Sequence, residues 1–187
     1  MRRGDVLLFV DATILRLFPP LRACWARRGQ QAVVRISGQN ARRVLFGALN
    51  PRTGHRVVLK RPRMRQEDFQ AFLRLLRKRY RGRRIWLLLD KARCHEAASS
   101  QRLAANLKME LVWLPKQCSE LNAMDHLWRG LKGHVSANRQ FKNIDEHADQ
   151  ATEWVLGLSS RAALRKAGVL SKSFWLKDFL RIFWPPT

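Results

Sequence analysis

The sequence has few cysteines, few acidic residues and no long apolar run. Only three cysteines occur, scattered without a C-x-x-C pair: Cys24, Cys94 and Cys118. This pattern indicates neither a disulfide framework nor a zinc ribbon, and it is typical of a reducing compartment. No stretch approaches the roughly 18 consecutive apolar residues that a membrane-spanning helix needs. Asp5 and Asp11 flank the apolar start of the chain and argue against a targeting segment. We therefore expect a soluble, cytoplasmic protein with no membrane partner.

Acidic residues are outnumbered by basic ones. The chain of 187 residues has 37 Lys+Arg against 14 Asp+Glu, a formal net charge of +23 at pH 7. Such a charge repels itself unless a polyanion is close, so nucleic acid is the leading partner. A solvated basic surface and a ribosome-associated or membrane-surface role remain alternatives. Charge alone does not say whether the protein cuts nucleic acid or only binds it.

Apolar periodicity predicts strands followed by alternating helices and strands. The strand-like segments are Val6–Val10, Gln31–Ser37, Arg43–Leu49, Arg56–Lys60, Ile85–Leu89 and Leu111–Leu114. Helical spacing covers Gln66 to about Gly82, Ser99–Leu107, about Ser119 to Val135, and Ile144–Leu156. A turn at 50–54 indicates that the third and fourth strand-like segments pair as a hairpin. This order favours an α/β, ribonuclease H-like fold, a mixed sheet flanked by helices, although other α/β folds share parts of it.

The length suits one compact unit with a sizeable core. We expect a catalytic domain over residues 1–158 and a C-terminal helical tail over 159–187. The tail is rich in aromatic and aliphatic side chains: Phe174, Trp175, Leu176, Phe179, Leu180, Phe183 and Trp184. Such a segment either packs on the core or contacts a partner, and packing is the preferred interpretation.

Two aspartates directly follow runs of five apolar residues. Asp11 comes after Val6–Val10 and Asp90 after Ile85–Leu89. A single aspartate in this position usually caps a turn, but a carboxylate next to a buried strand is costly unless it is compensated. If the two strands are parallel neighbours, both carboxylates emerge at the same edge of the sheet, where α/β sheets place their ligands. A divalent cation is the usual remedy for their repulsion.

Asp125 is the candidate for a third carboxylate. It borders the apolar face of the helix that begins near Ser119, although an ordinary surface aspartate in a first helical turn explains it equally well. Glu120 is the competing candidate. Three carboxylates around two Mg²⁺ or Mn²⁺ ions suit phosphodiester chemistry, and hard oxygen ligands do not favour zinc.

These acids lie in three blocks that carry a family resemblance. The blocks are Val10-Asp11-Ala12, the stretch from Leu89 to His95, and the stretch from Leu114 to Asp125 followed by Leu127-Trp128. They resemble the signature blocks of DDE-superfamily transposase catalytic domains, in the mariner-related bacterial insertion-sequence 630 family. The 34 residues between Asp90 and Asp125 are similar to the family's spacing, and the resemblance extends from about Asp5 to about Leu156. It implies a ribonuclease H-like core with Asp11, Asp90 and Asp125 as catalytic, metal-binding residues for DNA cleavage and strand transfer.

The chain departs from the family near these acids. Ala12 replaces a common Glu, Lys91 an Asn and Ala123 a Pro. Lys91 could repel a metal or bind a phosphate. His95 matches the family's histidine after the second acid and is a candidate for orienting water or substrate, with a purely structural role equally open. Asn122 is expected to support the helix start or the site.

The resemblance also implies partners. These are transposon ends and target DNA, with a homodimer left open, in a bacterial, nucleoid-associated setting. Relatives carry a helix-turn-helix before the catalytic core, whereas Asp11 lies near the start of this chain. We expect that region to be missing or supplied by a separate protein from an upstream frame. Two alternatives remain: a degenerate relative that only binds DNA, and a ribonuclease or Holliday-junction nuclease on the same fold.

The densest basic stretch runs from Arg52 to Arg84, with 13 Lys+Arg. Its cations are expected to clamp backbone phosphates on either side of the metals, although a solvated helix face explains part of it. The candidates are Arg56, Lys60, Arg61, Arg63, Arg65, Arg77, Lys78, Arg79, Arg81, Arg83 and Arg84. Four tryptophans in or beside apolar runs are expected in the core: Trp25, Trp86, Trp113 and Trp128.

Overall fold

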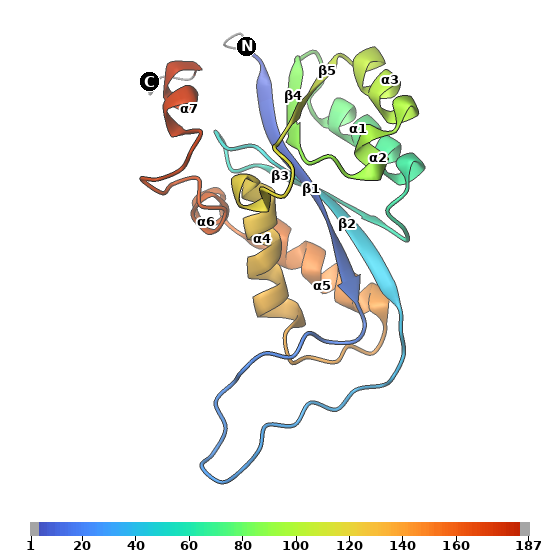
Figure 1. Ribbon diagram of the computed structural model, residues 1–187, viewed down its shortest axis with the longest axis vertical. Helices are drawn as coiled ribbons and strands as arrows, with labels where there is room; N and C mark the ends of the chain where they lie inside the picture. Colours follow the sequence, from blue (N-terminus) through green and yellow to red (C-terminus); the bar gives the residue numbers. More distant parts are fainter. Residues whose placement is uncertain (1–3, 184–187) are drawn as a thin grey trace.

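A mixed five-stranded sheet forms the centre of the protein (Figure 1). The computed structural model describes residues 4–183. The strands are β1 (Val6–Arg16), β2 (Arg42–Leu49), β3 (Arg56–Arg61), β4 (Ile85–Leu89) and β5 (Met109–Trp113). Their order is β3-β2-β1-β4-β5, in which β1 pairs antiparallel with β2 and parallel with β4. The predicted hairpin of β2 and β3 is confirmed.

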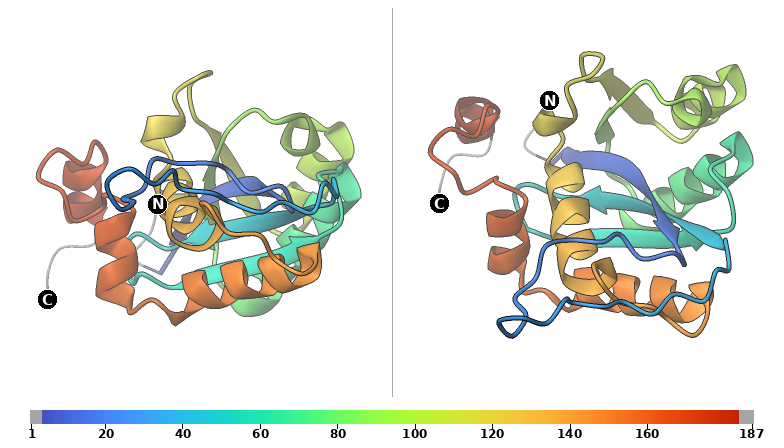
Figure 2. Two further views of the ribbon diagram at one scale, coloured as in Figure 1. Left: turned by 90° about the horizontal axis from the view of Figure 1, so that it is seen from below. Right: turned by 60° about the horizontal axis from the view of Figure 1, so that its bottom comes forward.

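Helices cover both faces of the sheet (Figures 1 and 2). One face carries α1 (Gln66–Arg79), α2 (Arg93–Glu96) and α3 (Ala98–Asn106). The other carries α4 (Ala123–Leu131) and α5 (Ile144–Gly157), joined through a π-helical turn at Lys132–Ser136. A 3₁₀ turn at Ser119–Leu121 precedes α4, and α6 (Ser160–Lys166) and α7 (Lys177–Phe183) end the described chain. The predicted α/β, ribonuclease H-like architecture is therefore confirmed.

The continuous apolar run of β1 reflects burial on both sides. Leu7 and Phe9 pack into the core beneath α4 and α5, whereas Leu8 and Val10 pack into the core beneath α1. Because successive side chains alternate between faces, a strand covered on both sides needs an apolar residue at every position. The same parity places Asp11 on the face that α4 covers.

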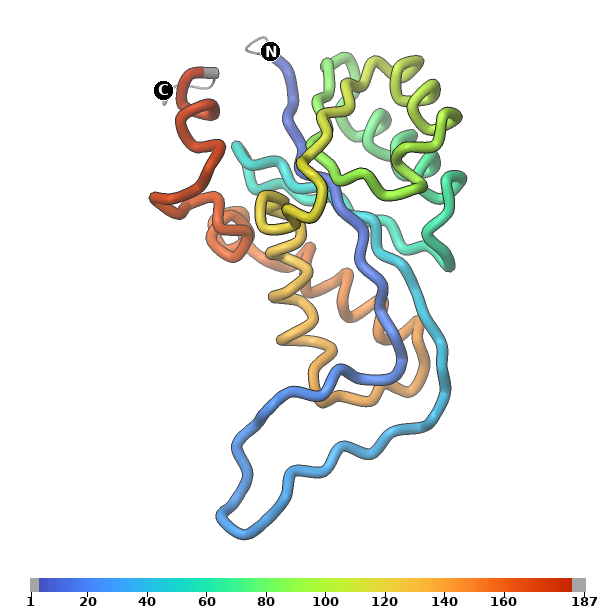
Figure 3. Tube along the Cα trace, viewed as in Figure 1, coloured from blue at the N-terminus to red at the C-terminus, as the bar shows by residue number. Residues whose placement is uncertain are grey.

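Three expectations about the β1–β2 region are wrong. β1 does not end at Asp11 but continues along β2 to Arg16. The segment Gln31–Ser37 forms no strand, because it belongs to a long connection that projects away from the sheet and has no neighbouring strand to pair with (Figure 3). Trp25 lies in the same connection and is fully exposed, whereas Trp128 is buried.

Helix α4 packs unusually close to the sheet at Gly47. This glycine is the β2 residue opposite Asp11, and a Cβ atom there would stand 2.4 Å from the side chains of both Met124 and Trp128. Any side chain at position 47 would therefore push α4 outward. The absence of a side chain sets the distance between the sheet and the helix that carries Asp125.

The tail contributes to the core that α4 and α5 form. Leu176 is buried in it, and the ring of Phe174 lies 6.0 Å from that of Phe9. Trp175 donates a hydrogen bond to the Leu121 carbonyl at 3.0 Å. Trp184 and the Phe183 side chain lie outside the described residues. No helix within residues 4–183 is long and apolar enough to cross a membrane.

Candidate active site

The three predicted acids line one open cleft of about 510 Å³. Parallel pairing of β1 and β4 runs through Phe9 and Leu88, so Asp11 and Asp90 each lie two residues beyond the last pair. The prediction that their strands are parallel neighbours is confirmed. Asp125 enters the cleft from the first turn of α4. The cleft therefore opens beyond the carboxyl end of β4.

The Asp11 carboxyl has a raised pKa. Burial raises its pKa, and the charges of Asp90 and Asp125 raise it further, to about 7, despite an opposing hydrogen bond from the Ala12 backbone. The two neighbouring carboxylates thus act on Asp11 in the way expected of acids that share a site. Either a proton or a bound cation would offset the cost of keeping the Asp11 carboxylate ionised in this site.

Asp90 is held by His95. The imidazole is fully buried, lies against the Phe69 ring, and its Nδ1 stands 2.9 Å from Asp90 Oδ1. Burial lowers the pKa of His95, but the hydrogen bonds and charges of Asp90 and Cys94 outweigh it and raise the pKa to about 9. The hydrogen bond with His95 in turn lowers the pKa of Asp90.

Asn122 links Asp125 to the sheet. Its side-chain amide donates a hydrogen bond to the Val10 carbonyl at 2.9 Å, while its Oδ1 accepts one from the Met124 backbone at 3.0 Å. One buried residue thus caps α4 and ties it to the strand residue before Asp11. Asp125 itself forms an ion pair of 2.7 Å with Arg129.

The competing acid, Glu120, does not line the cleft. Its side chain is exposed in the 3₁₀ turn before α4, and its backbone carbonyl accepts a hydrogen bond from His126 at 3.0 Å. Lys91 does line the cleft. Sequence reasoning missed other cleft residues, including Lys116 and Gln117. The Pro-Lys-Gln loop after β5 gave no signal of its own beyond lying within a family block.

The acids do not stand as a formed metal site. Within residues 4–183, no three His, Cys, Asp or Glu side chains are grouped so that they could hold an ion. Asp90 is turned to His95 and Asp125 to Arg129. The donors nevertheless suit a divalent cation, because carboxylate oxygens are the ligands that Mg²⁺ and Mn²⁺ prefer. The raised pKa of Asp11, caused first by burial and then by the charges of Asp90 and Asp125, is consistent with a site that lacks its cation.

The predicted DNA-binding cations do not border this cleft. Several are engaged within the protein: Lys60 pairs with Asp149 at 2.6 Å, Arg61 with Asp68 at 2.6 Å. Arg56 donates to backbone carbonyls at the end of α5. The cations at the end of α1 precede β4, whereas Asp90 follows it. Only the cations at the end of α1 lie at the far end of the sheet, whereas the carboxyl end of β3, with Lys60 and Arg61, lies toward the end that carries the acids. DNA binding by all of these residues remains a prediction.

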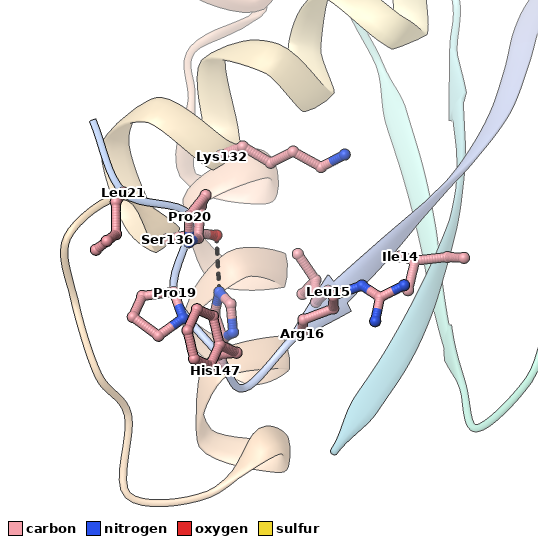
Figure 4. Close-up of a pocket in the computed structure, with 10 residues that line it drawn as sticks. Ile14, Leu15, Arg16, Pro19, Pro20, Leu21, Lys132, Ser136 and His147 are labelled. Atoms are coloured by element: carbon pink, nitrogen blue, oxygen red, sulfur yellow. Dashed lines mark hydrogen bonds between the residues drawn. The ribbon is translucent and has the colours of Figure 1, made fainter. Parts of the chain in front are cut away.

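A second cleft, of about 410 Å³, lies where the long connection leaves β1 (Figure 4). Pro19, Pro20 and Leu21 line it together with His147, which forms a hydrogen bond of 2.8 Å with Ser136 Oγ. Burial lowers the pKa of His147. No Asp or Glu side chain lines this cleft, so it offers no carboxylate ligands of the kind that the three acids provide.

A mixed sheet with carboxylates gathered beyond the carboxyl end of β4 defines the class as ribonuclease H-like. Residues 6–147 match the model of the DDE superfamily endonuclease family. The chain therefore belongs to that family. The resemblance to insertion-sequence and mariner transposases is confirmed.

Relatives and solved structures agree with this assignment. The chain is 29% identical over 140 residues to the insertion element IS630 uncharacterized 39 kDa protein of Shigella sonnei, covering 74% of this chain and 41% of that protein. It is 30% identical over 103 residues to the uncharacterized protein y4pE/y4sA of Sinorhizobium fredii (strain NBRC 101917 / NGR234), covering 54% of this chain and 74% of that protein.

Among solved structures, the Mos1 transposase paired-end complex with left transposon end superposes with a TM-score of 0.68 at 18% identity, covering 91% of this chain and 54% of that one. The catalytic domain of Mos1 mariner transposase gives 0.62 at 15% identity, covering 89% and 77%. These likenesses establish the fold. The chain spans about half the length of several of these proteins.

Proposed function

We propose that this chain is a transposase catalytic domain that cleaves DNA and joins strands with two divalent metal ions held by Asp11, Asp90 and Asp125. The observation that carries the proposal is the convergence of three carboxylates, from two neighbouring strands and a facing helix, in one open cleft. Transposon ends and target DNA are the proposed substrates.

The residues around the acids have distinct proposed roles. His95 keeps the Asp90 carboxylate in place through its buried Nδ1, and Asn122 fixes α4 against β1. Lys91 and Lys116 line the cleft and supply positive charge for a scissile phosphate. Bound Mg²⁺ or Mn²⁺ would activate water or a 3′-hydroxyl and stabilise the leaving oxygen.

Nicking of a duplex oligonucleotide in Mg²⁺ or Mn²⁺ tests the proposal. Asp90→Asn should abolish nicking while binding of the same duplex survives, since the substitution removes a ligand but no cation. Glu120→Gln is the matched control: it removes one negative charge beside the cleft, from the acid that does not line it, and should keep nicking. If Glu120→Gln abolished nicking while Asp90→Asn kept it, the assignment of Asp90 as a metal ligand would be rejected.

A DNA-binding relative without catalysis is the second candidate. Lys91 beside the acids favours it, as do the ion pairs that draw Asp90 and Asp125 toward His95 and Arg129. This candidate predicts duplex binding with no metal-dependent nicking in the unaltered protein. A preference for RNA–DNA hybrids or branched junctions in the same assay would instead indicate a different nuclease on this fold.

A further inference from the structure

A basic cleft, separate from the two clefts described above, lies at the end of the sheet opposite the acids. It has a volume of about 720 Å³ and sits between the turn that joins α1 to β4 and the turn that joins α3 to β5. Because β4 and β5 are parallel neighbours that begin in register at Ile85 and Met109, these two turns lie side by side. We refer to it as the rear cleft.

Both turns carry exposed cations. Arg83 and Arg84 enter from the first turn and Lys108 from the second, and Glu110 is the acid that lines the cleft. Gly82 and Lys108 adopt positive φ angles of 70° and 56° at the chain reversals that form these turns. Lys78 and Arg81 are exposed next to this group.

Only some of these cations form hydrogen bonds or ion pairs within the protein. Arg84 pairs with Glu110 at 2.8 Å and stacks over Trp86, and Arg77 caps the Leu107 carbonyl at 3.1 Å. Within residues 4–183, however, no hydrogen bond or ion pair engages four of the side chains: Lys78, Arg81, Arg83 and Lys108. Arg83 and Lys108 line the cleft itself, and Lys78 and Arg81 are near them along the chain or on the adjoining turn, so a bound anion would reduce the repulsion between these like charges.

The rear cleft is too far away to serve the acids. The five residues of β4 lie between Arg84 and Asp90, so the two residues are six steps apart, about 20 Å at the usual rise of a strand. A phosphate bound there is therefore distinct from one bound in the acid cleft. Open, solvent-exposed cations on two adjacent turns suit a polymer with repeated charges, because each phosphate contact adds to the affinity without base recognition.

We propose that the rear cleft is a second, sequence-independent site for the phosphate backbone of double-stranded DNA. The inference rests on the proposed function only in taking DNA as the partner, and it does not require the chain to be catalytic.

Lysine footprinting tests the site directly. The full chain carrying Asp90→Asn is acetylated in EDTA with and without a duplex, at low salt, and the modified lysines are quantified by mass spectrometry. Lys108 should be protected by the duplex, whereas Lys172, exposed beyond α6, should not. Equal acetylation of Lys108 with and without DNA would overturn the proposal. Stronger protection by double-stranded RNA than by DNA would assign the site to RNA and overturn it too.

Charge variants give an independent measurement. Arg81→Gln/Arg83→Gln/Lys108→Gln removes three cations from the rear cleft, and Arg161→Gln/Arg165→Gln/Lys172→Gln removes three exposed cations elsewhere. The slope of log K against log [salt] is negative, and the rear variant should make it less steep by up to about 2.7, at about 0.9 per lost phosphate contact. The control variant should leave the slope unchanged, and equal slopes in both variants would contradict the proposal.

Nicking separates this inference from the proposed function. Footprinting in EDTA does not depend on nicking, so the two readouts are independent. Protection of Lys108 in a protein that never nicks would reject catalysis and keep the rear site. Nicking without any protection of Lys108 would support catalysis and reject the rear site.

Discussion

At the scale of single residues, Asn122 controls how Asp125 meets the other two acids. It is buried, and its two hydrogen bonds join the start of α4 to the Val10 carbonyl. Both partners are backbone groups, the Val10 carbonyl and the Met124 N–H, and both lose this hydrogen bond when the amide is removed. A buried carbonyl left unpaired costs about 1–3 kcal/mol.

Replacing this residue should weaken both the fold and the site. Asn122→Ala should lower the free energy of unfolding by about 2–4 kcal/mol, from the lost cap and the unpaired carbonyl together, and should reduce nicking further because Asp125 is no longer fixed. Urea unfolding and initial nicking rates measure the two effects. Asn138→Ala is the control, since that asparagine also makes two backbone hydrogen bonds but in an exposed loop. Equal losses in both variants would contradict a special role for Asn122.

The raised pKa of Asp11 predicts an unusual pH dependence. In metal-free protein the folded-state pKa of about 7 exceeds the ordinary aspartate value of 3.8. Asp11 therefore contributes stability that is present below about pH 4 and is lost as the pH rises through 7. Relative to Asp11→Asn, the unaltered protein in EDTA should lose stability between pH 4 and pH 8.

Thermal unfolding across this range checks the prediction. Added Mn²⁺ at pH 8 should restore stability to the unaltered protein and have a smaller effect on Asp11→Asn, because a bound cation replaces the proton. A constant difference between the two proteins from pH 4 to pH 8 would show that the Asp11 carboxyl titrates normally.

At the scale of elements, the contact between α4 and β2 determines where the third acid lies. Gly47 faces Met124 and Trp128 across this contact and pairs with Asp11 in the sheet. The Met124 side chain can yield, but the Trp128 ring is buried and tightly packed. A methyl group at position 47 must therefore displace the helix or the strand.

Gly47→Ala should destabilise the protein by about 1–3 kcal/mol, the usual cost of overpacking a core. Nicking should fall as well, since a shift of α4 moves Asp125 away from Asp11. Gly157→Ala provides the control, because a Cβ atom at the end of α5 meets nothing within 4 Å. Denaturant midpoints compare the two variants, and an unchanged midpoint for Gly47→Ala would mean that the contact is loose.

At the scale of the whole molecule, positive charge dominates. The formal net charge is +23, and exposed cations occur on elements at opposite ends of the sheet. Contacts from such cations to phosphates release counterions from DNA. Affinity should therefore depend on salt more than on base sequence.

Binding to a duplex of arbitrary sequence should weaken steeply between 50 and 200 mM salt. With about six phosphate contacts, the loss in affinity is on the order of 10³-fold. Fluorescence anisotropy titrations at several salt concentrations give the slope, and an uncharged single-stranded analogue of the same sequence should not bind. An affinity that is insensitive to salt would contradict a mainly electrostatic surface.

The sequence by itself determined the sheet strands next to the site and two of its acids. Apolar runs of five residues identify β4 and the first half of β1 because these strands are buried on both faces, and the aspartates after them stand out against that background. The choice of Asp125 as the third acid depended on the family resemblance, since helical periodicity alone left Glu120 as a competing candidate. The order of strands and helices then restricted the fold to few architectures.

Only the tertiary structure decided which segments have neighbours. The β-branched residues of Gln31–Ser37 have strand propensity but no partner strand, so they remain in an exposed connection. The cations after α1 are close to Asp90 in sequence, yet β4 runs between them and carries them to opposite ends of the sheet. Contacts such as Asn122 with Val10 join residues far apart in the chain, and local patterns carry no information about such distances.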